Sequence, residues 1–174
     1  LIAAGGGLVA ALVTFSPGDP SLNSASGAPV HNLLGPAGAY LSDALMQGLG
    51  LAAFLPSPVL IVWGWKLLRK QSVPRPWWRL GFLISAMVLA AAGAAPAPNG
   101  GFWPLVAGPG GVGGSLVLEK FSNLLAYYAP AVDPRYLSAA CAGLAVPAFL
   151  YALGLSFAEW RAFGGTFFRA GKGI

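Results

Sequence analysis

Charged side chains are scarce in this 174-residue chain: they make up 9% of its residues, whereas hydrophobic residues make up 56%. Soluble domains carry about 25% charged residues, so this chain has too few charges to cover itself with a water-compatible surface. Its mean hydropathy of +0.69 indicates that lipid supplies much of its solvent. The 25 glycines and 15 prolines are compatible with membrane helices, and the apolar content excludes a disordered chain.

Residues that carry chemistry are also few. Cys141 is the only cysteine and His31 the only histidine, which excludes a disulfide framework and argues against a metal centre. The glycine run at 108–114 lacks the Gly-Lys-Ser/Thr that a phosphate-binding loop needs. The sequence has no Ser/His/Asp, Cys/His or paired-carboxylate arrangement. We therefore expect no catalysis, no cofactor and no metal in this chain itself.

Four apolar segments, 1–15, 36–68, 77–95 and 136–160, predict an all-α membrane protein with four transmembrane helices. Segment 1–15 would rise only about 22 Å as a helix, against a hydrocarbon core of about 30 Å. We therefore expect the first span to begin before Leu1. Segment 36–68 is too long for one crossing, so its first turns are expected at or above the lipid headgroups.

Prolines fall inside two of these segments. Pro56 and Pro58 are expected to interrupt the second helix, and Pro147 the fourth. Broken helices bind ions and substrates in transporters, which makes a small multi-span transporter or channel subunit the alternative function. Kinked helices in ordinary bundles are commoner, and no inverted repeat relates the two halves of the sequence.

Basic residues are distributed unevenly among the connections, which predicts the orientation in the membrane. Two connections hold only Lys120 and Arg135. The other bases lie between the second and third segments or after the fourth: Lys66, Arg69, Lys70, Arg75, Arg79, Arg161, Arg169 and Lys172. Because cytoplasmic loops are rich in lysine and arginine, we expect both termini in the cytoplasm, with 161–174 as a cytoplasmic tail.

With both termini in the cytoplasm, the long connection 96–134 is expected on the outer side of the membrane. Its first part is too rich in glycine and proline for a continuous helix, whereas 115–128 carries an apolar stripe at helical spacing. The stripe consists of Val117, Phe121, Leu124, Leu125 and Tyr128. We expect this amphipathic helix to lie on the membrane surface or to dock on the bundle; a partner protein bound to the stripe is the alternative.

Polar residues near the second segment are candidates for a function. Asp43 and Gln47 share a helix face, and an acid inside a membrane is a functional candidate. Asp43 is nevertheless expected at the interface, where an acid near a helix N-terminus stabilises the helix dipole. For His31 we expect a structural role as a polar anchor at the outer membrane interface.

Small residues recur at four-residue spacing and predict close helix contacts. The pairs are Gly6 with Ala10, Gly7 with Ala11, Ala44 with Gly48, Gly48 with Ala52, and Ala139 with Gly143. The sequence leaves open whether these contacts form within one subunit or between subunits.

The order of several motifs resembles a known family. Asp19-Pro20-Ser21 follows the first segment, and His31-Asn32 precedes Gly35 and Gly38; Ala44-Leu45, Gly48 and Pro56 come later in the second segment. A glycine-rich outer loop with a helix and a basic tail complete the pattern. Together these features resemble the N-terminal four-helix transmembrane domain of the FtsK/SpoIIIE family of DNA translocases, most sharply over 16–68.

The resemblance implies a membrane anchor in cell division and chromosome segregation, located in the bacterial inner membrane at the division septum. Its implied partners are the lipid bilayer and other division-site membrane proteins. The motif residues, Asp19, Pro20, His31, Asn32, Gly35, Gly38 and Asp43, are expected to shape the outer end of the second helix. ATP, magnesium, DNA contact and assembly into a hexamer are implied only for a motor region that this sequence does not contain.

Overall fold

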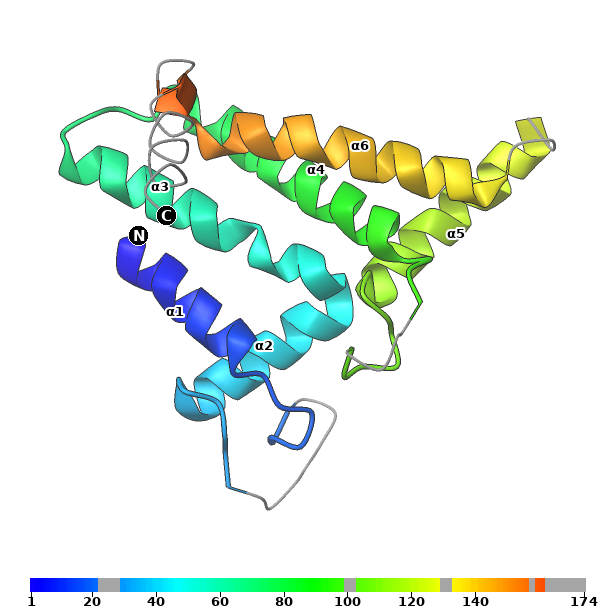
Figure 1. Cartoon of the computed structure of the whole chain (residues 1–174), viewed down its shortest axis with the longest axis horizontal. Helices are drawn as coiled ribbons and strands as arrows, with labels where there is room; N and C mark the ends of the chain where they lie inside the picture. Colours follow the sequence, from blue (N-terminus) through cyan, green and yellow to red (C-terminus); the bar gives the residue numbers. More distant parts are fainter. Residues whose placement is uncertain (22–28, 99–102, 129–132, 157–158, 162–174) are drawn as a thin grey trace, which may run out of the picture.

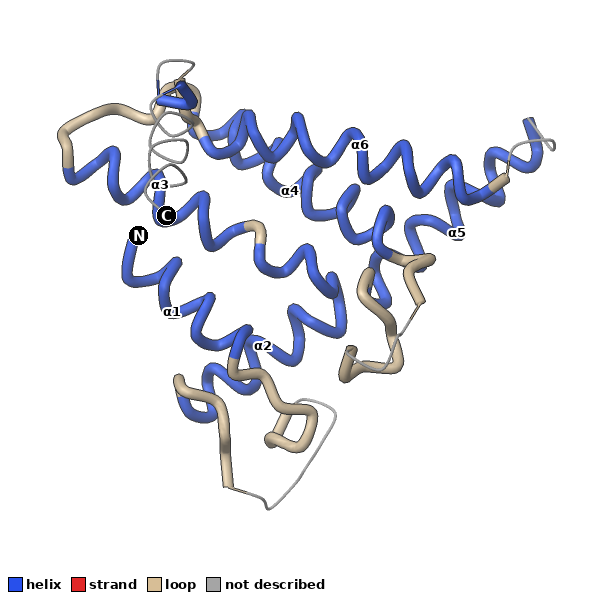
Figure 2. The backbone as a smooth tube through the Cα atoms, in the orientation of Figure 1, coloured by secondary structure: helices blue, strands red, loops and turns tan. Residues whose placement is uncertain are grey.

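The computed structural model describes residues 1–21, 29–98, 103–128, 133–156 and 159–161, and every regular element within them is a helix (Figure 2). The elements are α1 Ile2–Val13, α2 Gly35–Leu49, the 3-10 helix η1 Gly50–Phe54, α3 Pro56–Leu68, α4 Pro76–Ala94, α5 Gly111–Tyr128 and α6 Pro134–Leu153. The predicted all-α class is confirmed for these residues. Most of the expected tail, 162–174, lies outside the described part of the chain.

Four of the helices carry a proline in their first two positions. Proline suits these positions because a helix leaves its first N–H groups unpaired and proline has none. The residues are Pro36 in α2, Pro56 in α3, Pro76 in α4 and Pro134 in α6. The Asp133 side chain also caps α6, where it accepts a hydrogen bond of 2.8 Å from the backbone N–H of Arg135.

Helices α4 and α6 lie side by side and run in opposite directions (Figure 1). Both are long and apolar enough to cross a membrane. Small side chains permit their close approach: Ala86, Ala92 and Ala152 are completely buried. At Gly93 the two helices are so close that an added Cβ would lie 2.8 Å from the Cβ of Ala142.

Segment 36–68, expected as one helix interrupted near Pro56, is broken just before that proline. The chain bends by 60° between the helical segments Gly35–Phe54 and Pro56–Leu68. Together the two segments are long and apolar enough to form one broken membrane span or a re-entrant loop. Five residues before the break, where α2 meets η1, Gly50 has φ +58°, a conformation that glycine adopts at little cost. The backbone N–H of Leu51 donates to the Pro109 carbonyl at 2.8 Å. The glycine-rich connection before α5 therefore packs against the junction of α2 and η1.

Pro147 and the end of the fourth helix differ from the sequence-based expectation. Pro147 lies inside a continuous α6 and does not interrupt it; neighbouring helices make such prolines tolerable in membrane proteins. The helix ends at Leu153 rather than at residue 160, because Gly154 takes the left-handed conformation (φ +75°) that terminates helices.

Helix α5 begins at Gly111, inside the glycine run that we expected to be irregular. A Cβ at Gly114 would collide with the Ala91 carbonyl of α4, and a Cβ at Gly113 would lie 2.6 Å from the Gly48 carbonyl of α2. Close packing of α5 on these two helices thus outweighs the low helix propensity of glycine.

The predicted apolar stripe of α5 is only partly covered by the bundle. Val117 and Leu125 are half-buried, whereas Phe121, Leu124 and Tyr128 are exposed. Helix α5 docks on α2 and α4 through its glycine-rich start. Its position on the membrane surface stays a prediction.

Buried hydrophobic residues in the described part of the chain form two clusters. One cluster consists of Val59, Leu83, Ala152 and Leu153 and joins α3, α4 and α6. The other consists of Leu12, Met46 and Ala53, with Phe54 and Trp103 packed against it. The first cluster thus includes the C-terminal end of α6, and the second includes the C-terminal end of α1.

Candidate functional site

The most extensive polar cluster that includes motif residues closes the connection between α1 and α2. Its centre is Asp19, which is only 3% exposed. One carboxylate oxygen accepts from the backbone N–H of His31 at 2.9 Å, and the other accepts from that of Asn32 at 2.9 Å. The His31 ring Nδ1 also lies 3.0 Å from the first oxygen. Asp19 therefore ties the two ends of the connection together.

Asn32 links this connection to both neighbouring helices. Its Nδ2 donates to the Ala11 carbonyl of α1 at 2.8 Å and to Ser42 Oγ of α2 at 3.3 Å. Its Oδ1 accepts from the backbone N–H of Leu34, the N-cap residue of α2, at 3.1 Å. We call Asp19, His31, Asn32 and Ser42 the α1–α2 clasp.

The two motif glycines shape the backbone beside the clasp. Gly35 has φ +64°, and its N–H donates to the Asn32 carbonyl at 2.9 Å. At Gly38 a Cβ would overlap Asn32 Oδ1 and lie 2.6 Å from the Leu34 Cβ. Gly35 therefore permits the turn into α2, and Gly38 leaves room for the Asn32 amide. The structure thus brings five predicted motif residues together.

Pro20 and Asp43 lie outside the clasp. Pro20 follows Asp19 and is half-buried. Asp43 is 6% exposed on α2 and accepts a hydrogen bond of 2.7 Å from Gln47 Nε2. The predicted shared face of Asp43 and Gln47 is therefore present. Within the described residues, no three His, Cys, Asp or Glu side chains are grouped as metal ligands would be.

The predicted small-residue pairs have mixed surroundings. Ala52 is buried in η1, and the Gly48 backbone contacts the start of α5. Ala44, Ala139 and Gly143 are exposed; the last two therefore do not form the α6 contact within this chain. Of the earlier pairs, Ala11 is buried whereas Gly6 is exposed.

Other glycines make the close helix contacts that the sequence-based prediction missed. A Cβ at Gly5 would lie 2.8 Å from the Ser57 carbonyl, and one at Gly64 would lie 2.8 Å from the Ile2 backbone nitrogen. These contacts pack α1 against α3, as Gly93 packs α4 against α6. A glycine inside an apolar segment signals close packing, but it does not indicate which helix is the partner.

A second polar cluster, which the sequence-based prediction also missed, covers the C-terminal end of α6. Lys66 Nζ donates to the Gly154 carbonyl at 2.7 Å, and Trp63 Nε1 donates to the Ala152 carbonyl at 3.1 Å. Arg79 donates to the Tyr151 carbonyl. These donors satisfy carbonyls that a helix end leaves unpaired, and the cations interact favourably with its dipole. We call Trp63, Lys66 and Arg79 the α6 cap.

Glu159 forms an ion pair with Lys66 of the α6 cap. It lies beyond the end of α6 and accepts from Lys66 Nζ at 2.9 Å and from the backbone N–H of Ser156 at 2.6 Å. Hydrogen bonds from Ser156, and then from Lys66, lower the pKa of Glu159 to about 2. The Asp19 pKa is lowered too, chiefly by the His31 backbone N–H. Both carboxylates are thus held in the charged form.

Acid is expected to destabilise the chain through these two carboxyls. Their ordinary pKa values are 3.8 and 4.5, and the folded values are lower, so the unfolded chain binds more protons as the pH falls. Their contribution to stability is therefore complete above the ordinary values and is lost progressively below them. Thermal unfolding in detergent from about pH 6 to about pH 3 measures the slope, which Asp19→Asn and Glu159→Gln should each flatten. An unchanged slope in both variants would contradict this assignment.

Known proteins are similar to this chain along most of its length. The family model for the 4TM region of DNA translocase FtsK/SpoIIIE matches residues 1–161. A DNA translocase FtsK of Azospirillum brasilense is 40% identical over 163 residues, which cover 89% of this chain and 24% of that protein. The corresponding protein of Bradyrhizobium diazoefficiens is 42% identical over 119 residues, with 68% and 14% covered.

A third relative, the DNA translocase FtsK of Agrobacterium fabrum, is 35% identical over 149 residues, which cover 84% of this chain and 16% of that protein. The chain therefore spans a quarter or less of the length of these relatives. No solved structure matches it.

Proposed function

Because the chain belongs to the FtsK/SpoIIIE family of DNA translocases, as its 4TM region, we propose that it anchors a septal DNA translocase in the bacterial inner membrane. The family match over residues 1–161 carries this proposal. The anchor itself is non-catalytic. ATP hydrolysis with magnesium, DNA contact and hexamer formation belong to a motor region outside this chain, in the part of the relatives' length that it does not span.

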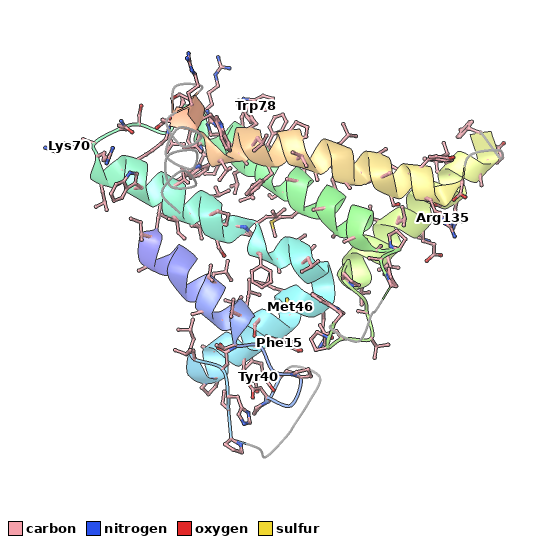
Figure 3. All side chains as sticks on the ribbon, viewed as in Figure 1. Phe15, Tyr40, Met46, Lys70, Trp78 and Arg135 are labelled. Atoms are coloured by element: carbon pink, nitrogen blue, oxygen red, sulfur yellow. The ribbon has the colours of Figure 1, made fainter. Side chains whose placement is uncertain are left out.

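The placement of the described bases supports an orientation with this end in the cytoplasm. Lys66, Arg69, Lys70, Arg75 and Arg79 lie where α3 ends and α4 begins. Lys70 and Arg135 lie at opposite ends of the molecule (Figure 3). The clustered bases favour the cytoplasmic side by the positive-inside rule, so both termini are cytoplasmic in this proposal.

The surface beside the α1–α2 clasp is the proposed contact for other division-site membrane proteins. Leu33, Leu34, Tyr40 and Leu41 are exposed there, next to the His31 ring, which is 68% exposed. The clasp fixes the backbone from which these side chains project. Exposed apolar side chains on a rigid polar frame suit a protein contact in or just outside the membrane.

Transport through the broken second segment has less support. Broken helices in transporters bind substrate where unwound backbone lines a cavity. Here backbone fills the space beside the junction of α2 and η1, five residues before the break: a Cβ at Gly50 would collide with the Pro109 carbonyl and lie 2.8 Å from the Gly111 nitrogen. The junction is therefore a packing joint between α2, η1 and the start of α5.

Septal localisation of a fluorescent fusion tests the proposal. The full-length protein should gather at the septum, and a Tyr40→Ser, Leu41→Ser double variant should spread along the membrane at equal expression. The comparison variant, Phe121→Ser with Leu124→Ser, alters exposed apolar residues on α5 instead. Loss of recruitment in the α5 variant alone would contradict the contact assigned to the clasp surface. Uniform membrane distribution of the unaltered protein would contradict the septal anchor.

A further inference from the structure

Two cavities meet at the α6 cap. One, of about 580 Å³, is polar and is lined by Gln71, Ser72, Arg79 and Ser156 among others. The other, of about 640 Å³, is mainly apolar, and its lining includes Ile2, Ile61, Val62 and Trp65. Lys66, Gln71, Leu155 and Glu159 belong to both linings. A molecule with a polar head and an apolar chain can therefore occupy both cavities at once.

The charge around these cavities favours an anion. Lys66 is 9% exposed and is paired with Glu159, so these two charges offset each other. Arg79 lines the polar cavity, and Arg69 lines the apolar one with its guanidinium 4.6 Å from the centre of the Trp65 ring. Guanidinium groups are well suited to phosphate because they donate several hydrogen bonds in a plane.

Arg79 is held in place for this contact. Its Nε donates to the Pro74 carbonyl at 2.7 Å, and its guanidinium lies 4.8 Å from the centre of the Tyr151 ring. Immobilising the guanidinium before binding reduces the entropy lost when an anion binds. Exposed Trp77 and Trp78 at the start of α4 are the side chains that membrane proteins place at headgroup depth.

We propose that these cavities bind one anionic phospholipid. Its phosphate lies in the polar cavity against Arg79, Gln71 and Ser72, and one acyl chain lies along Ile61, Val62 and Trp65. Basic pockets at the ends of transmembrane helices suit such headgroups. The proposal requires only that the chain lies in a membrane, so it stands or falls separately from the septal anchor function.

Retention of lipid by the whole chain, purified in neutral detergent, tests the headgroup site. In native mass spectrometry phosphatidylglycerol should bind about tenfold more tightly than phosphatidylcholine, as expected for a charge-assisted contact. Arg79→Gln should remove most of that preference. Arg135→Gln, at the other end of α6, should bind phosphatidylglycerol within about twofold of the affinity of the unaltered chain. Equal affinity for the two lipids, or equal losses in the two variants, would overturn the proposal.

A second variant keeps the test valid where loss of the Arg79 contacts disturbs the fold. Ser72→Glu adds a negative charge to the polar cavity from an exposed position outside the helices, and it should weaken phosphatidylglycerol binding about tenfold. Asn123→Glu, on exposed α5, is its control and should have little effect. If the two glutamate variants bind phosphatidylglycerol equally well, the headgroup does not lie in this cavity.

Acyl-chain placement distinguishes a lipid from a free anion. Phosphatidylglycerol with brominated chains should quench Trp65, read as the difference between the unaltered chain and Trp65→Phe. Absence of that quenching would overturn the chain placement. Displacement of the lipid by an equal concentration of inorganic phosphate would assign the site to a free anion, and displacement by a DNA oligonucleotide would assign it to nucleic acid; either result would overturn the proposal.

Discussion

Gly38→Leu is expected to open the α1–α2 clasp and to lower the free energy of unfolding by about 3 kcal/mol, at the upper end of the range for overpacking. The reason is geometric, because a Cβ at Gly38 occupies the space of Asn32 Oδ1. Displacing that amide removes its hydrogen bonds to the Ala11 carbonyl and to Ser42 Oγ. Thermal unfolding in detergent measures the loss, and septal recruitment of the full-length protein should fall with it.

Gly6→Leu is the matched control for this substitution. Gly6 also lies in an apolar helix, but an added Cβ there meets nothing within 4 Å. The control should therefore unfold at or near the temperature of the unaltered chain. Equal stability of the two leucine variants would show that the Asn32 amide does not need the space above Gly38, and the clasp would lose its proposed role in positioning Tyr40 and Leu41.

The predicted motif included three of the four clasp residues, Asp19, His31 and Asn32, but the sequence did not indicate how they bond. Asp19, His31, Asn32, Gly35 and Gly38 were selected together because their order resembles a family motif. Spacing alone did not indicate that Asp19 receives two backbone N–H groups or that Asn32 reaches α1. Those contacts depend on how Asp19 and Asn32 are placed beside α1 and α2 in the tertiary structure, and the sequence carries no local signal for that placement. Ser42 was missed for the same reason.

The helical class was predictable from composition and periodicity, whereas helix boundaries depended on packing. A long apolar segment such as 77–95 matches α4 closely because nothing within it competes with helix formation. The start of α5 was misjudged because Gly111 and Gly114 are poor helix formers in isolation. Their lack of side chains lets α5 contact α2 and α4, and that benefit exists only in the folded chain.

The contacts of the basic residues at one end of the bundle were likewise not predictable from the sequence. Their uneven distribution predicts an orientation through a rule that counts charges and ignores geometry. It did not indicate that Lys66 donates to the carbonyl of Gly154, just after α6, or that Arg79 donates to the carbonyl of Tyr151 within it, because α3, α4 and α6 are brought together only in the tertiary structure. A basic residue can therefore favour one orientation in the membrane and also cap a helix C-terminus through a hydrogen bond.

Lys66→Met is expected to lower the free energy of unfolding by about 2 kcal/mol, between the values typical of exposed and of buried ion pairs. Lys66 is 9% exposed but its partner Glu159 is 31% exposed, so water screens one half of the pair. The substitution keeps the apolar stem and removes the donor to Gly154 and Glu159. The end of α6 then loses one cap donor, and thermal unfolding in detergent should show the loss.

A double-mutant cycle separates the two contacts of Lys66. Glu159→Gln retains an oxygen that can accept from the Ser156 N–H, so alone it should cost about 1 kcal/mol or less. In the Lys66→Met background the same change should cost nothing or restore stability, because it removes a carboxylate that has lost its cation. Additive losses in the double variant would mean that the Gly154 carbonyl, and not Glu159, is the partner through which Lys66 stabilises the bundle.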